Sequence, residues 1–142
     1  MQRLLISFVT VALVSILVGC GASAERVSDR EQRELPTFAY FLIQDLCFQG
    51  DSGSDTSFAR KANARARREF VALERSLKAH PDARVLVKFK PADSPGLETE
   101  ELSVRQLAKT HLDGAEDGGL PWEKRCYEAA LARLRAALEE AG

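Results

Sequence analysis

The stretch FARKANARARREFVALERSLKA, residues 58–79, decides the fold because it predicts one long helix with a sharply divided surface. Apolar side chains recur every three or four residues, which is the spacing of one buried helix face. The predicted core stripe consists of Phe58, Ala62, Ala66, Phe70, Leu73 and Leu77. His80 and Pro81 end the helix, because proline disfavours helical backbone in the residue before it. The rest of the domain is therefore expected to cover this stripe.

Shorter apolar segments flank the long helix on both sides. The segment TFAYFLIQDLCF, residues 37–48, follows Pro36 and is apolar on nearly every side, so it predicts a buried helix. Beyond the long helix, RVLVKFK (84–90) alternates between apolar and charged residues, which predicts a half-buried strand. The sequence PADSPG then turns the chain, and residues 97–102 predict a polar return strand at the edge of a hairpin.

Two more helices complete the predicted domain. Ser103 with Gln106 three residues later is the pattern of a capping box, which opens a helix that runs to about Leu112. DGAEDGG (113–119) predicts a loop, and Pro121 begins a last helix. The apolar stripe of this last helix consists of Tyr127, Leu131, Leu134 and Leu138. We expect one α-rich α+β domain over residues 35–142, with about four helices and one β-hairpin.

The first twenty residues have the layout of a secretory signal. Arg3 precedes an uncharged apolar run, residues 4–19, which is short for a membrane-spanning helix. Leu17-Val18-Gly19-Cys20 resembles the lipobox of bacterial lipoproteins, in which an aliphatic and a small residue precede an obligatory cysteine. The resemblance implies that residues 1–19 are a signal peptide. It also implies that a diacylglyceryl group is attached to the sulfur of Cys20, which becomes the first residue of the mature chain.

Two other outcomes remain open for this segment. Ala22-Ser23-Ala24 fits the rule of ordinary signal peptidase, which would release a soluble product that begins at Glu25. An uncleaved anchor is the third reading. Residues 23–34 are polar and charged without periodicity, and we expect residues 20–34 to be the lipidated cysteine and a flexible tether.

Export places Cys47 and Cys126 in an oxidising compartment, where two thiols in a small domain usually form a disulfide. The bond would join the first predicted helix to the last one. Cys47, Cys126, His80 and His111 would also make a zinc quartet. However, no two of them have the close spacing of such sites, and oxidation competes for the thiols, so no metal is expected.

Charge is balanced in total but segregated along the chain. The protein has 20 Lys and Arg against 21 Asp and Glu, which indicates no bulk affinity for nucleic acid. Six cations nevertheless share the face of the long helix opposite the core stripe: Arg60, Lys61, Arg67, Arg68, Arg75 and Lys78. This face is either solvated or meets anions such as phospholipid headgroups, acidic envelope polymers or an acidic partner protein. No aromatic residues interleave the cations to stack bases.

The sequence contains little that suggests catalysis. Only His80 and His111 would act as bases at neutral pH. His80 ends a helix, where a histidine usually interacts with terminal carbonyls, and His111 lies on an apolar face and is interpreted as a core histidine. No phosphate loop, nucleophile elbow or metalloprotease motif is found. We therefore expect neither an enzyme nor a cofactor.

The sequence as a whole favours a lipid-anchored protein of the bacterial cell envelope, on the outer membrane or the outer face of the plasma membrane. Its domain would be a binding or accessory module that uses the basic helix face. The alternative is a small-ligand-binding or sensor lipoprotein, with an apolar pocket lined by Phe41, Phe70 and Phe89.

Overall fold

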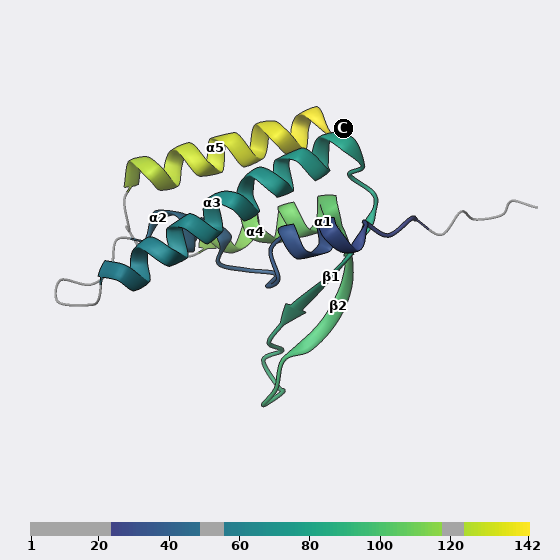
Figure 1. The fold of residues 1–142 in the computed structure, drawn as a ribbon, viewed down its shortest axis with the longest axis horizontal. Coiled ribbons are helices and arrows are strands. Elements are labelled where there is room, and N and C mark those ends of the chain that lie inside the picture. Colours follow the sequence, from purple (N-terminus) through teal and green to yellow (C-terminus); the bar gives the residue numbers. More distant parts are fainter. Residues whose placement is uncertain (1–23, 49–55, 118–123) are drawn as a thin grey trace, which may run out of the picture.

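The computed structural model describes residues 24–48, 56–117 and 124–142, which form a helix-rich α+β fold with one antiparallel hairpin (Figure 1). The elements are α1 (Asp29–Glu34), α2 (Leu42–Cys47), α3 (Thr56–Ala79), β1 (Arg84–Phe89), β2 (Glu98–Ser103), α4 (Val104–Asp117) and α5 (Lys124–Glu140). The predicted class is confirmed, with five helices in the described part instead of about four. The predicted signal peptide, Cys20 and Pro121 lie outside the described residues. None of the helices in the described ranges is long and apolar enough to cross a membrane.

Helix α3 is the centre of the core, as its apolar stripe predicts. Helices α1, α2, α4 and α5 all contact it, and the hairpin projects from this helical body (Figure 1). Four of the six predicted stripe residues are buried: Ala66, Phe70, Leu73 and Leu77. Phe58 corrects the prediction, because its side chain is 67% exposed. It lies in the first turn of α3, at the end of the core, where its ring meets Phe48 edge-on.

The predicted helix over residues 37–48 is also corrected, since α2 begins only at Leu42. Residues 37–39 instead run parallel to β1: Ala39 N–H donates to the Lys88 carbonyl at 3.0 Å, and Lys88 N–H donates to the Thr37 carbonyl at 2.8 Å. This pairing satisfies backbone groups on the edge of β1. A helix at residues 37–39 would leave those groups of β1 unpaired. As a result, Phe38 and Phe41 are 44% and 61% exposed instead of buried.

The segment predicted to be a tether is also ordered on the domain from Glu25 onward. Val27 N–H donates to the Arg84 carbonyl at 3.0 Å, and Arg84 N–H donates to the Glu25 carbonyl at 2.8 Å. Helix α1 follows, with Ser28 as its N-cap: the Ser28 hydroxyl accepts from Glu31 N–H at 3.2 Å. The domain therefore begins about ten residues earlier than the sequence predicts.

Gln32 of α1 closes the gap between these two paired segments. Its side-chain Nε2 donates to the Leu86 carbonyl at 2.8 Å, and its Oε1 accepts from Leu86 N–H at 2.8 Å. The amide thus pairs with β1 as a neighbouring strand would. We call residues 25–39 the N-terminal clasp, because they cover the outer edge of β1 at three successive positions. Covering an edge strand in this way prevents its open backbone groups from pairing with another chain.

The hairpin and the helix that follows it agree well with the sequence. β1 and β2 are antiparallel with Val87 opposite Glu100, and Val85 and Val87 point into the core. The capping box is present, since Gln106 N–H donates to the Ser103 hydroxyl at 3.0 Å and Ser103 N–H donates to Gln106 Oε1 at 2.8 Å. Helix α4 continues to Asp117, so part of the predicted loop after Leu112 is helical.

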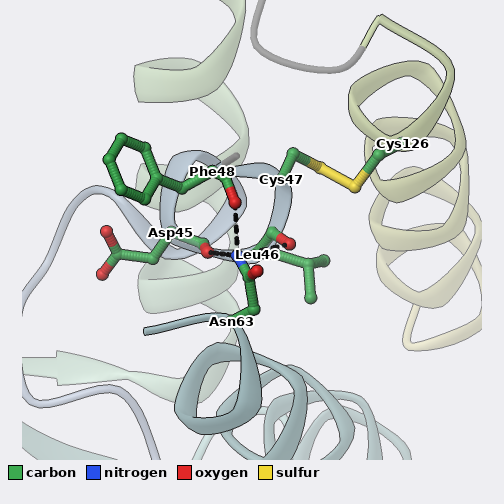
Figure 2. The surroundings of a disulfide bond; sticks show 6 residues. All are labelled: Asp45, Leu46, Cys47, Phe48, Asn63 and Cys126. Atoms are coloured by element: carbon green, nitrogen blue, oxygen red, sulfur yellow. Dashed lines mark hydrogen bonds between the residues drawn. A yellow bond between two sulfur atoms is a disulfide. The ribbon is translucent and has the colours of Figure 1, made fainter. Parts of the chain in front are cut away.

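The structure brings the predicted cysteine pair to bonding distance, with the sulfur atoms of Cys47 and Cys126 2.06 Å apart (Figure 2). The disulfide links the end of α2 to the first turn of α5. Beside it, Asn63 of α3 holds the C-terminal end of α2: its Nδ2 lies 2.7 Å from the carbonyl of Asp45 and 2.9 Å from that of Phe48 (Figure 2). These contacts satisfy carbonyls that a helix end leaves unpaired.

Replacing both cysteines with serine should lower the free energy of unfolding by about 2–5 kcal/mol, because the bond restricts the unfolded chain. Urea denaturation of the oxidised protein, the reduced protein and the double variant measures this effect. The reduced protein should unfold at the same urea concentration as the double variant. A variant as stable as the oxidised protein would show that the bond adds nothing.

Gln32→Ala should cost about 0.5–1.5 kcal/mol of unfolding free energy, because Leu86 N–H and carbonyl exchange their side-chain partners for water. Arg30→Ala is the matched control on the same helix, since Arg30 is well exposed and makes only a surface ion pair with Glu34. Thermal unfolding of the two variants provides the comparison. Equal effects would mean that the amide does not support β1.

Candidate functional site

The six predicted basic residues of α3 are all exposed. They fall into two groups in the structure. Arg67, Arg68 and Arg75 line a groove of about 770 Å³ between α1 and the outer face of α3. Arg60, Lys61 and Lys78 do not line it. The structure therefore divides the predicted basic face into a groove and flanking cations.

Two arginines that the sequence analysis did not single out also line the groove. Arg33 comes from α1, and Arg65 lies at the margin of the basic face of α3. Arg33 was missed because its segment was interpreted as a tether. A signal was available: Ser28 followed by Glu31 is the start of a capped helix, and the structure uses it in that way. We call this site, with its five arginines at positions 33, 65, 67, 68 and 75, the arginine groove.

Acidic residues neutralise only part of the arginine groove. Glu34 accepts from Arg30 Nε at 3.1 Å and pairs with Arg75, and the hydrogen bond from Arg30 is the main cause that lowers the pKa of Glu34. Arg65 lies 3.6 Å from Glu69. Within the described residues, no ion pair engages Arg33, Arg67 or Arg68. The positive charge of Arg68 favours the ionised form of the neighbouring Glu69. Arg33 and Arg67 are therefore the cations of the groove most available to a partner.

The arginine groove also contains one exposed apolar side chain. Val71 is 51% exposed in the middle of the basic face, and Ala72 lies beside it in the wall. On the far side of α3, Glu74 is held by Arg133 of α5, with both N–O distances at 2.5 Å. Arg133 in turn stacks 5.1 Å above the ring of Phe70. Because α5 engages Glu74, this acid does not neutralise the groove.

His80 makes a different contact from the one predicted. Its ring Nε2 lies 2.5 Å from Glu31 Oε1, and the hydroxyl of the buried Ser76 donates to the same oxygen. A carboxylate from α1 thus takes the place of the terminal carbonyls expected from sequence. The contact fastens α1 to the C-terminal end of α3 and so fixes one wall of the arginine groove.

His111 is a core histidine, as predicted. Its side chain is 1% exposed, and its Nδ1 accepts from Leu42 N–H at 3.4 Å. Burial lowers the pKa of His111 to about 3, because the charged ring would lose its hydration. The imidazole is therefore neutral at pH 7. Its Nε2 has no hydrogen-bond partner in the part of the chain that the structure describes.

The other residues considered from sequence do not come together. The described residues contain no group of three or more metal-ligating side chains, and both thiols of the zinc quartet are in the disulfide. The three phenylalanines of the apolar-pocket alternative have separate environments. Phe70 is buried in the core, whereas Phe41 is largely exposed, so they do not line one closed cavity.

Comparison of the chain with protein-family models, with curated protein sequences and with solved structures finds no match in any of the three. The site is therefore interpreted from its own geometry.

Acid should destabilise the protein partly through His111. Because its pKa is lowered in the folded state, the unfolded chain binds more protons, so this contribution is complete above about pH 6.5 and is lost as the pH falls toward about 3. The slope from one such group reaches at most about 1.4 kcal/mol per pH unit. His111→Asn keeps an acceptor for Leu42 N–H and removes the titration. Urea denaturation at several pH values should give a shallower acid slope for this variant, and an unchanged slope would contradict the assignment.

Proposed function

We propose that this protein is a lipid-anchored envelope lipoprotein whose domain binds an anionic partner through the arginine groove. The anchor is Cys20, and the support for it is the lipobox-like sequence Leu17-Val18-Gly19-Cys20. The partner is an acidic protein of the envelope or the anionic headgroups of the membrane itself. The observation that carries the proposal is the gathering of five arginines, from α1 and α3, around one groove.

The arrangement of the anchor supports this proposal. Residues from Glu25 onward are paired with β1, so only residues 21–24 separate Cys20 from the domain. Whatever their conformation, these residues span at most about 18 Å. A domain held so close to a membrane experiences the headgroup potential, which extends over about one Debye length.

The composition of the arginine groove supports a specific partner. Arg33, Arg67 and Arg68 provide forked guanidinium groups, which bind carboxylates and phosphates with two parallel hydrogen bonds. The exposed Val71 adds apolar area among them. Arginine is enriched at protein interfaces, where it commonly lies beside apolar side chains.

The test uses two double variants with the same change in charge. Arg67→Glu with Arg68→Glu reverses cations inside the arginine groove, whereas Arg60→Glu with Lys61→Glu reverses cations on the same helix outside it. At about 1 kcal/mol for each basic residue near an anionic surface, the first pair should weaken binding at least tenfold. The second pair should weaken it much less. Circular dichroism checks that both variants are folded.

Binding is measured in two ways, by co-sedimentation with phosphatidylglycerol vesicles and by recovery of crosslinked proteins from cell envelopes. Cys20→Ser removes the proposed lipid and serves as the control for attachment. Loss of vesicle binding in the groove variant alone identifies headgroups as the partner, and loss of one crosslinked protein identifies a protein. Equal effects of the two double variants on both measurements would refute the groove as the binding surface.

A further inference from the structure

The hairpin projects from the helical body, and one of its faces is used by neither the core nor the arginine groove (Figure 1). Val85 and Val87 of β1 point into the core, and successive side chains of a strand point to opposite sides. The even-numbered residues of β1 therefore share the outer side, where Leu86 is 42% exposed. β2 adds a second row to this side, with Thr99 opposite Lys88.

The N-terminal clasp adds a third row. Arg26 is in register with Arg84, and Phe38 is in register with Lys88, as in parallel strands. Residues in register on neighbouring strands point to the same side of a sheet. The ion pair of Arg26 with Glu101 of β2, at 2.7 Å, agrees with this arrangement. We call the following six residues the outer sheet face: Arg26, Phe38, Arg84, Leu86, Lys88 and Glu101.

The outer sheet face is both basic and partly apolar. It has three cations against one acid, and within the described residues no ion pair engages Arg84 or Lys88. Among these charges Phe38 is 44% exposed. The opposite side of β2 carries Glu98 and Glu100, so the hairpin has a basic side and an acidic side. Attraction to anionic lipids grows with cationic charge and with the apolar area that is buried, and the outer sheet face offers both.

The chain enters the domain at the edge of this face. Arg26 belongs to it, and the carbonyl of Glu25 before it accepts from Arg84 N–H at 2.8 Å. The chain from Cys20 to Glu25 spans at most about 18 Å. The headgroup layer of one leaflet takes up about 5–8 Å of this length. A lipid on Cys20 therefore holds the edge of the face within about 10–13 Å of the headgroup surface.

The rest of the face lies close to the same point. Arg84 and Lys88 are four residues apart, which is about 13 Å along a strand. Phe38 is in register with Lys88, so it lies at a similar distance from Arg26. The linker is longer than the face, so the anchored domain can place all of the face on the membrane.

From this geometry we infer that the outer sheet face is the surface on which the domain lies against the anionic phospholipid bilayer that holds its anchor. Phe38 and Leu86 enter the headgroup layer, and Arg84 and Lys88 bind lipid phosphates. The inference rests on the proposed anchor at Cys20, and it names where the membrane meets the domain. Because the anchor keeps the local concentration of lipid high, a small contact suffices.

The first experiment compares two neighbouring residues of β2 that point to opposite sides. Thr99→Cys and Glu100→Cys each receive a fluorophore in the full lipidated chain, where the disulfide and the acylated Cys20 leave the new thiol as the reactive one. The protein is reconstituted in phosphatidylglycerol vesicles that contain a lipid with a nitroxide quencher on its headgroup. The label at position 99 should be quenched several-fold more strongly than the label at position 100. Equal quenching, or stronger quenching at position 100, overturns the inference.

The second experiment alters the face and keeps the label at position 99. Leu86→Ser with Lys88→Glu removes an apolar side chain and reverses a cation, and it should lower the ratio of docked to undocked protein at least about fivefold. Leu97→Ser with Lys61→Glu makes the same changes on exposed residues outside the face and the groove, and it should have little effect. Equal effects of the two folded variants contradict the assigned face.

The unaltered chain provides a measurement that does not depend on any variant of the face. Quenching at position 99 should fall several-fold in phosphatidylcholine vesicles, because these have no net charge to attract the cations. Quenching that is the same in both kinds of vesicle contradicts the role of the cations.

A protein in place of the membrane is a separate outcome. With a photo-crosslinkable residue at position 99 in growing cells, phospholipid adducts are expected. One discrete protein adduct in their place overturns the choice of the membrane.

Failure of this inference is distinguishable from failure of the proposed function. The mass of the purified chain reports the lipid on Cys20, and an unacylated cysteine overturns the anchor and this inference together. An acylated chain with equal quenching at positions 99 and 100 overturns this inference alone. Arg67→Glu with Arg68→Glu changes the groove and should leave quenching at position 99 unchanged. Loss of that quenching in the folded groove variant would show that the groove, and not the outer sheet face, holds the domain on the membrane.

Discussion

The outer edge of β1 is the constraint on which the rest of the structure depends. A two-stranded sheet leaves one row of N–H and carbonyl groups open on each strand, and open groups near a core must find partners. The N-terminal clasp provides them at three positions: the backbone of residues 25–27, the side-chain amide of Gln32, and the backbone of residues 37–39. This pairing makes residues 25–34, which the sequence predicts to be part of a flexible tether, part of the domain.

The arginine groove is a consequence of this pairing. Because α1 lies between the two paired segments, it is held against α3, and Glu31 fastens it there through Ser76 and His80. The arginine groove is the space left between these two helices. The second paired segment ends at Ala39, and the left-handed backbone of Phe41 then leads the chain into α2, whose Leu42 N–H donates to His111.

The charged groups of the domain differ in how they are solvated. Arg33 and Arg67 are exposed and make no ion pair with the described residues, which suits long-range attraction of an anionic surface. His111, Asp45 and Glu69 are buried or half-buried, so each is shifted toward its neutral form.

The sequence by itself determined the elements whose periodicity is local: α3 with its buried Ala66, Phe70, Leu73 and Leu77, the β1–β2 hairpin, and the capping box at Ser103. It also identified Cys47 and Cys126 as a pair, because two thiols in a small domain that is predicted to be exported usually form a disulfide. Only the tertiary structure decided that residues 25–27 and 37–39 pair with β1. Their partners are backbone groups of β1 more than forty residues away, and a backbone group has the same chemistry in every residue, so no side-chain pattern announces the pairing.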